Sequence, residues 1–140
     1  MLIADVFSEY PGCLFEMSEM PELIEPRTWF RNAGGRIWVA QRDGEILGVV
    51  GVAPSEAGLM ELKKLYVAAK LRGTGVGSAL IGLVESFARE HNATGVHLWS
   101  DTRFELAHAV YEHKGYRRLP GTRDLHDVSH SIEYHYEKRF

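Results

Sequence analysis

Three glycines at alternating positions, Gly73, Gly75 and Gly77, constrain this chain more than any other feature of its sequence. They follow an apolar run that ends at Val67, and a helical pattern begins among them. Glycine has no side chain to hold a ligand off the backbone, and the first amides of a helix point outward with the positive end of the helix dipole behind them. The segment therefore predicts a strand, a phosphate-binding turn and a helix, with the Arg72 guanidinium suited to a pyrophosphate. A turn that merely packs tightly is the alternative.

The rest of the chain alternates helical and strand patterns and reads as one domain, residues 1–140. Helices are expected at Leu2–Tyr10, Met20–Asn32, Gly75–His91 and Phe104–Lys114, and strands at Arg36–Gln41, Glu45–Ala53, Gly58–Val67, Gly95–Trp99, Tyr116–Leu119 and Ser131–Lys138. Asp43-Gly44 favours a hairpin between the first two strands. The strand ending at Val67 lacks strict alternation, so a bulge re-aims it or both its faces are covered. Together these elements predict an α+β fold with a mixed sheet.

Composition excludes several classes of protein. The 140 residues are 45% apolar and 25% charged, as in globular domains. Sixteen Lys and Arg against 19 Asp and Glu, without a basic run, argue against a nucleic-acid partner. The longest apolar stretch, Ile46–Ala53, is far shorter than the roughly 20 residues of a spanning helix, so no membrane partner is expected. With Cys13 as the single cysteine and no leader pattern at the amino terminus, the expected location is the cytoplasm.

The residues after the glycines narrow the kind of phosphate ligand. No Gly-Lys-Ser/Thr follows them, which disfavours a nucleoside triphosphatase. The dinucleotide fingerprint G-x-G-x-x-G is not met either, because Ser78 and Leu80 occupy the two positions where the last glycine would stand. Two antiparallel strands also come before the turn, whereas a dinucleotide fold starts with parallel ones.

At this point the chain resembles the GNAT superfamily of acyl-CoA-dependent N-acetyltransferases. The superfamily's pyrophosphate motif, Arg/Gln-x-x-Gly-x-Gly/Ala, is met by Arg72, Gly75 and Gly77. A second signature, Ala-x-x-hydrophobic-Tyr-x-x-x-Gly-Tyr/Phe, is met by Ala107, Val110, Tyr111, Gly115 and Tyr116. The resemblance runs from about residue 36 to the carboxyl terminus. Within the superfamily the chain most resembles a group of small bacterial members, most of which have no assigned substrate. It implies a three-layer fold around a twisted, mostly antiparallel sheet that is splayed at the cofactor strand.

The resemblance also implies how acetyl-CoA is held. Its pantetheine arm would lie along the bulged strand, and the amides of the glycine turn would hold its pyrophosphate. The implied cofactor residues are Leu65, Tyr66, Val67, Arg72, Gly73, Thr74, Gly75, Val76, Gly77, Ser78, Phe104, Ala107 and Tyr111. No metal is expected, because the close spacing of His126 and His130 is not accompanied by strong carboxylate or cysteine ligands.

An amine would attack the thioester directly, with the backbone amide near Leu65 donating to the developing oxyanion. Tyr111 is the candidate general acid for the leaving thiolate, and a buried helix aromatic is its structural alternative. Glu61 is the candidate base, and a solvated strand carboxylate is the alternative for that residue. Cys13, far in sequence from both motifs, is expected to be a small apolar residue rather than a nucleophile.

Two departures from the family pattern affect the expectations. Members usually begin with a strand before the first helix, whereas this chain starts almost directly at that helix, so the first strand is expected to be missing or supplied from elsewhere. A sheet edge that is exposed in this way predicts a homodimer. Many members carry an asparagine where Phe104 stands here, so a cofactor contact by that amide is not expected.

The acceptor is expected to be a primary amine of a small molecule. Six acidic residues come before the first basic residue of the chain: Asp5, Glu9, Glu16, Glu19, Glu22 and Glu25. They form either a solvated helix face or a negatively charged entrance that attracts a cationic acceptor. Arg103 and Arg123 could instead hold an acceptor carboxylate or phosphonate, and His126 could line the acceptor site. Three alternatives stay open, namely a non-catalytic acyl-CoA sensing module, a nucleotide-binding regulatory domain and a protein N-acetyltransferase.

Overall fold

The structure, a computed structural model, describes residues 1–140 and is built around one six-stranded sheet. The strands are β1 (Arg36–Arg42), β2 (Glu45–Pro54), β3 (Leu59–Val67), β4 (Gly95–Asp101), β5 (Arg117–Asp124) and β6 (Ile132–Arg139). The helices are α1 (Leu2–Phe7), α2 (Pro26–Asn32), α3 (Val76–Glu90) and α4 (Glu105–His113). The strand order is β1-β2-β3-β4-β6-β5, and β3 with β4 is the one parallel pair.

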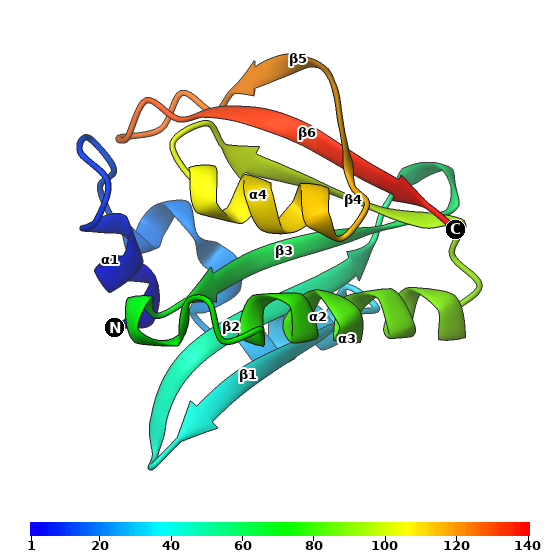
Figure 1. Cartoon of the computed structure of the whole chain (residues 1–140), viewed down its shortest axis with the longest axis horizontal. Helices are drawn as coiled ribbons and strands as arrows, with labels where there is room; N and C mark the ends of the chain where they lie inside the picture. Colours follow the sequence, from blue (N-terminus) through cyan, green and yellow to red (C-terminus); the bar gives the residue numbers. More distant parts are fainter.

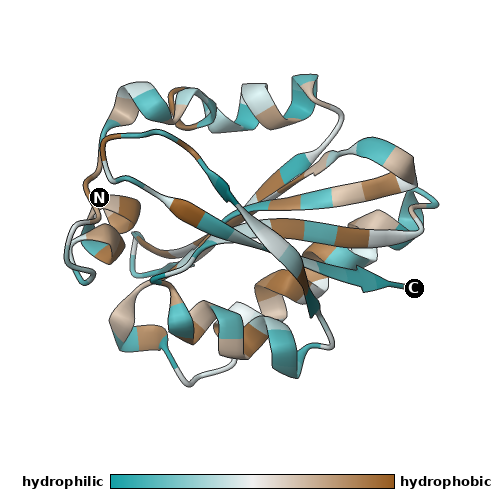
Figure 2. Ribbon diagram, turned by 90° about the horizontal axis from the view of Figure 1, so that it is seen from above, coloured by the Kyte–Doolittle hydropathy of each residue, from teal (hydrophilic) through white to brown (hydrophobic).

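Helices cover both faces of this sheet, which gives three layers (Figures 1 and 2). The larger core lies beneath α3 and α4, where Ile81, Val84 and Leu98 are fully buried. On the opposite face Phe30 of α2 lies directly on Gly51 of β2, and an added Cβ at Gly51 would stand 2.4 Å from the ring. The mixed, mostly antiparallel, three-layer fold expected from the sequence is confirmed.

The helix expected over Met20–Asn32 is confirmed only in its second half, as α2, and its first half is wrong. The chain instead makes short 3-10 turns at Met17–Glu19 and Pro21–Leu23 before α2 begins at Pro26. Proline has no N–H to continue a helix and disfavours helical backbone in the residue before it, and Glu25 has φ −135° and ψ 76°. The first helix is also shorter than expected, because α1 ends at Phe7, ahead of Pro11.

The strands are each found near their expected places, with one long extension. The hairpin turn has φ 52° at Asp43 and 78° at Gly44, as expected for an Asp-Gly turn. The expected strand Tyr116–Leu119 begins one residue later and runs on to Asp124, with a register shift between Arg118 and Thr122. The intervening Pro120 cannot donate to a ladder, so the extension bends at this edge strand instead of ending there.

A bulge in β3 positions the site. Val49 pairs with Tyr66 and Gly51 with Lys63, so β3 holds one residue more than β2 between these pairs, and Lys64 has φ 57°. The broken alternation of the sequence therefore reflects a bulge, one of the two alternatives. Pairing of β3 with β4 stops at Glu61 and His97, and beyond that point the two strands separate toward the end near α1 (Figure 1). We call this separation the gap.

Candidate functional site

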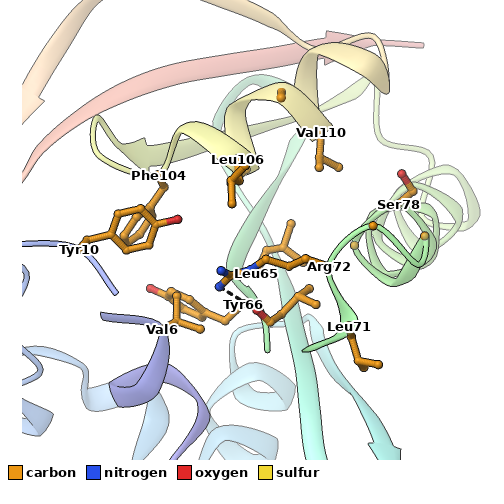
Figure 3. A pocket seen from close by; sticks show the side chains of 16 residues that line it. Val6, Tyr10, Leu65, Tyr66, Leu71, Arg72, Ser78, Phe104, Leu106 and Val110 are labelled. Atoms are coloured by element: carbon orange, nitrogen blue, oxygen red, sulfur yellow. Dashed lines mark hydrogen bonds between the residues drawn. The ribbon is translucent and has the colours of Figure 1, made fainter. Parts of the chain in front are cut away.

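A cavity of about 430 Å³ lies where the gap meets the glycine turn and α4. Its wall is formed by 16 residues, 11 of them hydrophobic (Figure 3). Ten of the residues assigned to the cofactor from the sequence line it: Leu65, Tyr66, Val67, Arg72, Gly73, Gly75, Gly77, Ser78, Phe104 and Ala107. The structure thus brings the two sequence motifs, which are about 30 residues apart, to the same cavity.

Three assigned residues do not line the cavity. The Thr74 hydroxyl donates to the carbonyl of Leu71 and so closes the turn. Val76 packs against the core beneath α3. Tyr111 is 4% exposed, and its ring centroid lies 5.7 Å from that of Tyr136.

The glycine turn has the geometry of an anion site. Gly75 is the N-cap of α3 with φ 88°, and no side chain caps the helix, so its first amides have no partner within the helix. An added Cβ at Gly75 would meet no heavy atom within 4 Å, so the glycine is needed for its backbone angle, not for space. At Gly77 the nearest atom would be 3.9 Å away, so a side chain there would enter open space in the cavity wall.

Arg72 lies at the rim of the cavity but is already paired. Its guanidinium donates to both carboxylate oxygens of Glu9 and, through Nη2, to the carbonyl of Val67 at 3.2 Å. The hydrogen bonds that Arg72 donates to Glu9 raise the pKa of Arg72 above its usual value. The arginine therefore joins the turn to the segment after α1 in addition to lending it charge.

The gap leaves backbone groups of β3 without a strand partner. From Leu62 onward the edge of β3 that faces β4 has no ladder partner, and Leu65, Tyr66 and Val67 line the cavity there. An extended ligand with amide groups can bond to such an edge as a further strand does.

Aromatic rings close the end of the cavity next to α1. Tyr10 and Phe104 have ring centroids 5.0 Å apart, and Phe104 also meets Tyr66 and Phe7 (Figure 3). The sequence analysis did not assign six lining residues: Val6, Tyr10, Leu71, Leu106, Ala109 and Val110. The helical spacing of Leu106, Ala109 and Val110 could have indicated those three, whereas nothing in the sequence marks Val6 or Tyr10.

The two candidate acid–base residues lie on different sides of the gap. Tyr111 comes from α4, directly after the lining residue Val110, and burial raises the pKa of its phenol, so it stays protonated at neutral pH. Glu61 stands opposite His97 where β3 and β4 are still paired, and its carboxylate lies 3.6 Å from Lys63 Nζ. It does not line the cavity.

The candidate acceptor residues have structural partners. Arg103 donates through Nε and Nη2 to the two oxygens of Asp101, at 2.8 and 2.7 Å. The His126 side chain is 84% exposed and lies 3.5 Å from Asp124, and neither Arg103 nor His126 lines the cavity.

Most of the six acidic residues in the amino-terminal quarter also have a cationic or hydrogen-bonding partner. Glu22 forms an ion pair with Lys64 at 2.7 Å, in addition to the pair between Glu9 and Arg72. Glu19 accepts from the backbone of Val128, and Glu16 from the backbone of Ser18. These pairs reduce the negative potential that the six carboxylates would otherwise present.

The remaining features carry no second site. Cys13 is buried in the small core with Ile3 and Phe7, and burial raises the pKa of its thiol, as expected for an apolar packing residue. No group of three or more His, Cys, Asp or Glu side chains is gathered for a metal ion. None of the helices has the length and apolar character needed to cross a membrane.

Known proteins share both the sequence pattern and the architecture. The uncharacterised N-acetyltransferase YjgM of Escherichia coli (strain K12) is 31% identical over 102 residues, which cover 71% of this chain and 61% of that protein. A GNAT-family acetyltransferase from Staphylococcus aureus Mu50 superposes with a TM-score of 0.83 at 23% identity, over 99% of this chain and 88% of that one. A GNAT-family acetyltransferase from Elizabethkingia anophelis with acetyl-CoA bound has a TM-score of 0.65 at 17% identity, over 87% and 84% of the two chains.

The two structures show that the fold is shared, and the chain spans less than two thirds of its E. coli relative. The model of the acetyltransferase (GNAT) family matches residues 3–116, which include the whole glycine turn and all of α4. Both motifs of the resemblance lie within that match, and both reach one cavity. The chain belongs to the acetyltransferase (GNAT) family.

Proposed function

We propose that this chain transfers an acetyl group from acetyl-CoA to a primary amine of a small molecule. The observation that carries the proposal is a single cavity that joins a capless, glycine-rich helix start to an unpaired strand edge. The helix start suits the pyrophosphate of CoA, and the strand edge suits the amides of its pantetheine arm. The thioester would then lie in the gap beside Tyr66 and Tyr111.

The chemistry requires no covalent intermediate on the protein. The amine nitrogen attacks the thioester carbonyl carbon, and the carbon–sulfur bond breaks as the amide forms. The backbone N–H near Leu65 donates to the oxyanion, and Tyr111 gives its proton to the departing thiolate and regains one from solvent. Glu61 is the base that the family resemblance suggests for the amine proton.

The acceptor, location and assembly complete the proposal. The small-molecule acceptor is kept from the sequence analysis, because the cavity described above is assigned to acetyl-CoA and does not itself select an acceptor. A cytoplasmic location agrees with a lone thiol buried as an apolar residue.

A homodimer is favoured because β1 is an edge strand and, together with the hairpin, carries exposed apolar side chains. Val39 and Ile46 are 50% and 49% exposed, and both line an apolar hollow beside α1. Light scattering of the wild type and of Val39→Lys tests this, and a wild type that stays monomeric at high micromolar concentration contradicts it.

Thermal shift combined with CoA release tests the reaction. CoA and acetyl-CoA should each raise the melting temperature, whereas ATP and NAD should not. A panel of amines, incubated with acetyl-CoA, should include at least one that releases free CoA. Stabilisation without turnover on any amine, small or peptidic, would favour a sensing module, and no stabilisation by CoA would contradict the proposal.

A further inference from the structure

Glu133 of β6 stands at the open end of the gap. The register of β6 on β4 places it directly opposite Asp101, the last residue of β4. Beyond His97 the other edge of β4 has no partner, because β3 has separated from it. Glu133 is therefore one strand away from the unpaired edge, at the end of β4 where the gap is widest (Figure 1).

The side chain of Glu133 lies on the face of the sheet opposite α4. Alternate residues of β6, Tyr134 and Tyr136, contact His108 of α4, so Glu133 and His135 project from the other face. Neither α1 nor α2 makes extensive contact with β4, β5 or β6, so no helix covers this part of the face. In the inference below the acceptor reaches the gap from this side, which the amino-terminal segment borders through its hydrogen bonds with Val128 and Ser129.

Glu133 is largely buried but keeps one oxygen unbonded. Its side chain is 14% exposed, and Arg123 Nε donates to Oε1 at 2.7 Å. Oε2 accepts no hydrogen bond, whereas every fully buried side-chain oxygen in the structure has a hydrogen-bond partner. Oε2 is therefore reachable by solvent, and a proton or an ammonium group can bind there.

Two neighbouring carboxylates are committed to structural cations. Asp101 is held by the Arg103 side chain and by its backbone N–H, at 2.9 Å. Glu22 is held by Lys64 at 2.7 Å. In both cases burial alone would raise the pKa, but the hydrogen bonds and charge of the cation bring the pKa below its usual value.

Glu133 differs from both in the direction of its pKa shift. Burial raises the pKa of its carboxyl above the usual value despite the hydrogen bond from Arg123, and the charge of Asp101 acts in the same direction. The charges of Arg123 on β5, Asp101 on β4 and Lys64 on β3 act on Glu133. The charge of Glu133 in turn acts on Tyr66 of β3 and Tyr111 of α4. The negative charge of Glu133 adds to the effect of burial in raising the pKa of Tyr66 and of Tyr111. Like Glu61, Glu133 does not line the cavity itself, so its place at the end of the gap rests on the strand register.

We propose that Glu133, rather than Glu61, receives the acceptor's amino group at the gap and takes its proton during acetyl transfer. This rests on the proposed function. As the amine nitrogen bonds to the acetyl carbon, one N–H proton passes to Oε2, directly or through one water, and is later released to solvent. The electron pair of the broken carbon–sulfur bond leaves on the thiolate, which Tyr111 protonates. Glu61 lies on the far side of the bulge from Leu65, where β3 and β4 are still paired.

The experiment compares Glu133→Gln, Glu61→Gln and Glu137→Gln with the wild type on an amine that the panel has identified. Glu137 is a matched control because it lies on the same strand and face, has a 13% exposed side chain and pairs with Arg139. We expect Glu133→Gln to lower kcat/KM by about 10²-fold or more. CoA affinity and melting temperature should stay near those of Glu137→Gln. Glu133→Asp, which keeps the carboxylate, should restore part of the rate.

The pH profile gives a readout that a structural role would not move. In the wild type kcat/KM should fall on the acid side as Glu133 is protonated, and in Glu133→Gln this limb should lose one unit of slope. Loss of rate and of slope in Glu61→Gln instead, or equal behaviour of Glu133→Gln and Glu137→Gln, would overturn the proposal. If Glu133→Gln melts early, the partial rescue and the retained pH limb of Glu133→Asp decide the question. A wild type that binds CoA but turns over no amine would overturn the proposed function, and this inference with it.

Discussion

Arg72 and Glu9 form a two-pronged ion pair at the rim of the cavity, with Nη2 3.0 Å from Oε2. The pair is between a quarter and a third exposed, with side chains 27% and 32% accessible. The Glu9 carboxylate, just after α1, thus binds the Arg72 guanidinium that would otherwise face the pyrophosphate of CoA. Glu9 and a bound diphosphate thus compete for one cation.

Neutralising Glu9 should tighten CoA binding. In Glu9→Gln the charge of Arg72 is no longer balanced locally, so its attraction for the diphosphate grows. An exposed pair of this kind is worth about 0–1 kcal/mol, which corresponds to a change in Kd of up to about fivefold. Calorimetric titration with CoA at low and at high salt measures it, and the gain should shrink as salt screens the charges. Asp5→Asn, a more exposed position on α1, is the control, and an equal gain there would contradict this account.

A side chain at Gly77 should block the cofactor without harming the fold. Gly77→Glu places a carboxylate in the cavity wall, where it both fills space and repels the pyrophosphate. We expect CoA affinity to fall at least tenfold while the melting temperature of the free protein changes little. Gly82→Glu is the matched control, since it makes the same change on the same helix at a position with no heavy atom within 4 Å of an added Cβ. Similar CoA affinities of the two variants would argue against this binding site.

Tyr111→Phe should separate binding from chemistry. The phenol ring is buried among Tyr116 and Tyr136, so the phenylalanine keeps the packing and the CoA affinity. Removal of the proton donor should lower the chemical rate by about 10²-fold. Tyr116→Phe controls for loss of a hydroxyl in the same cluster, because that hydroxyl donates to Glu85 at 2.9 Å, away from the cavity. Unchanged single-turnover rates in Tyr111→Phe would remove this residue from the mechanism.

Stability should fall as the solution becomes mildly acidic. Burial lowers the pKa of His97 and of His108 below the usual value, and His97 Nδ1 lies 2.9 Å from His135 Nε2. Their neutral forms stabilise the fold fully above the unfolded pKa of about 6.5, and this stability is lost as the pH falls through the lower folded pKa. The melting temperature should therefore drop below about pH 6.5.

A histidine variant identifies the source of that drop. His108→Gln keeps a hydrogen-bonding side chain next to Ser100 but cannot be protonated, so its melting temperature should depend less on pH than that of the wild type. His126→Gln should behave like the wild type, because His126 is 84% exposed. An unchanged pH dependence in His108→Gln would assign the acid sensitivity to other groups.

The cofactor side of the cavity could be predicted from the sequence because its signals are local. A glycine turn that starts a helix, and a tyrosine at a fixed distance before Gly115, depend on neighbours along the chain. The apolar spacing over Met20–Asn32 predicts a helix from Met20, but the α-helix begins only at Pro26, because proline disfavours helical backbone in the residue before it. Apolar periodicity alone predicts a continuous helix here, but one proline is enough to delay its start.

The acceptor side could not be predicted in the same way. Glu133 stands beside Asp101, at the end of β4, only because β6 pairs with β4, and this pairing joins residues that are 32 to 44 positions apart in the chain (Asp101 with Glu133, Gly95 with Arg139). Likewise, the ion pair of Glu133 with Arg123 depends on the pairing of β6 with β5. Long-range pairing of strands and the choice of ion-pair partner are set by tertiary packing, which no local pattern contains.

The extra residue in β3 makes the site sensitive to chain length as well as to side-chain chemistry. Leu65 packs toward the core beneath α3, while Tyr66 packs with the small core beside α1. Because Lys64 is the residue added by the bulge, its deletion alone would restore strict alternation and leave Leu65 and Tyr66 on their present faces, so only the bulge would be lost. A homologue that is one residue shorter here would keep both cores but would lose the bulged backbone that borders the cavity, so a deletion within Glu61–Val67 would alter the site without any change in side-chain chemistry.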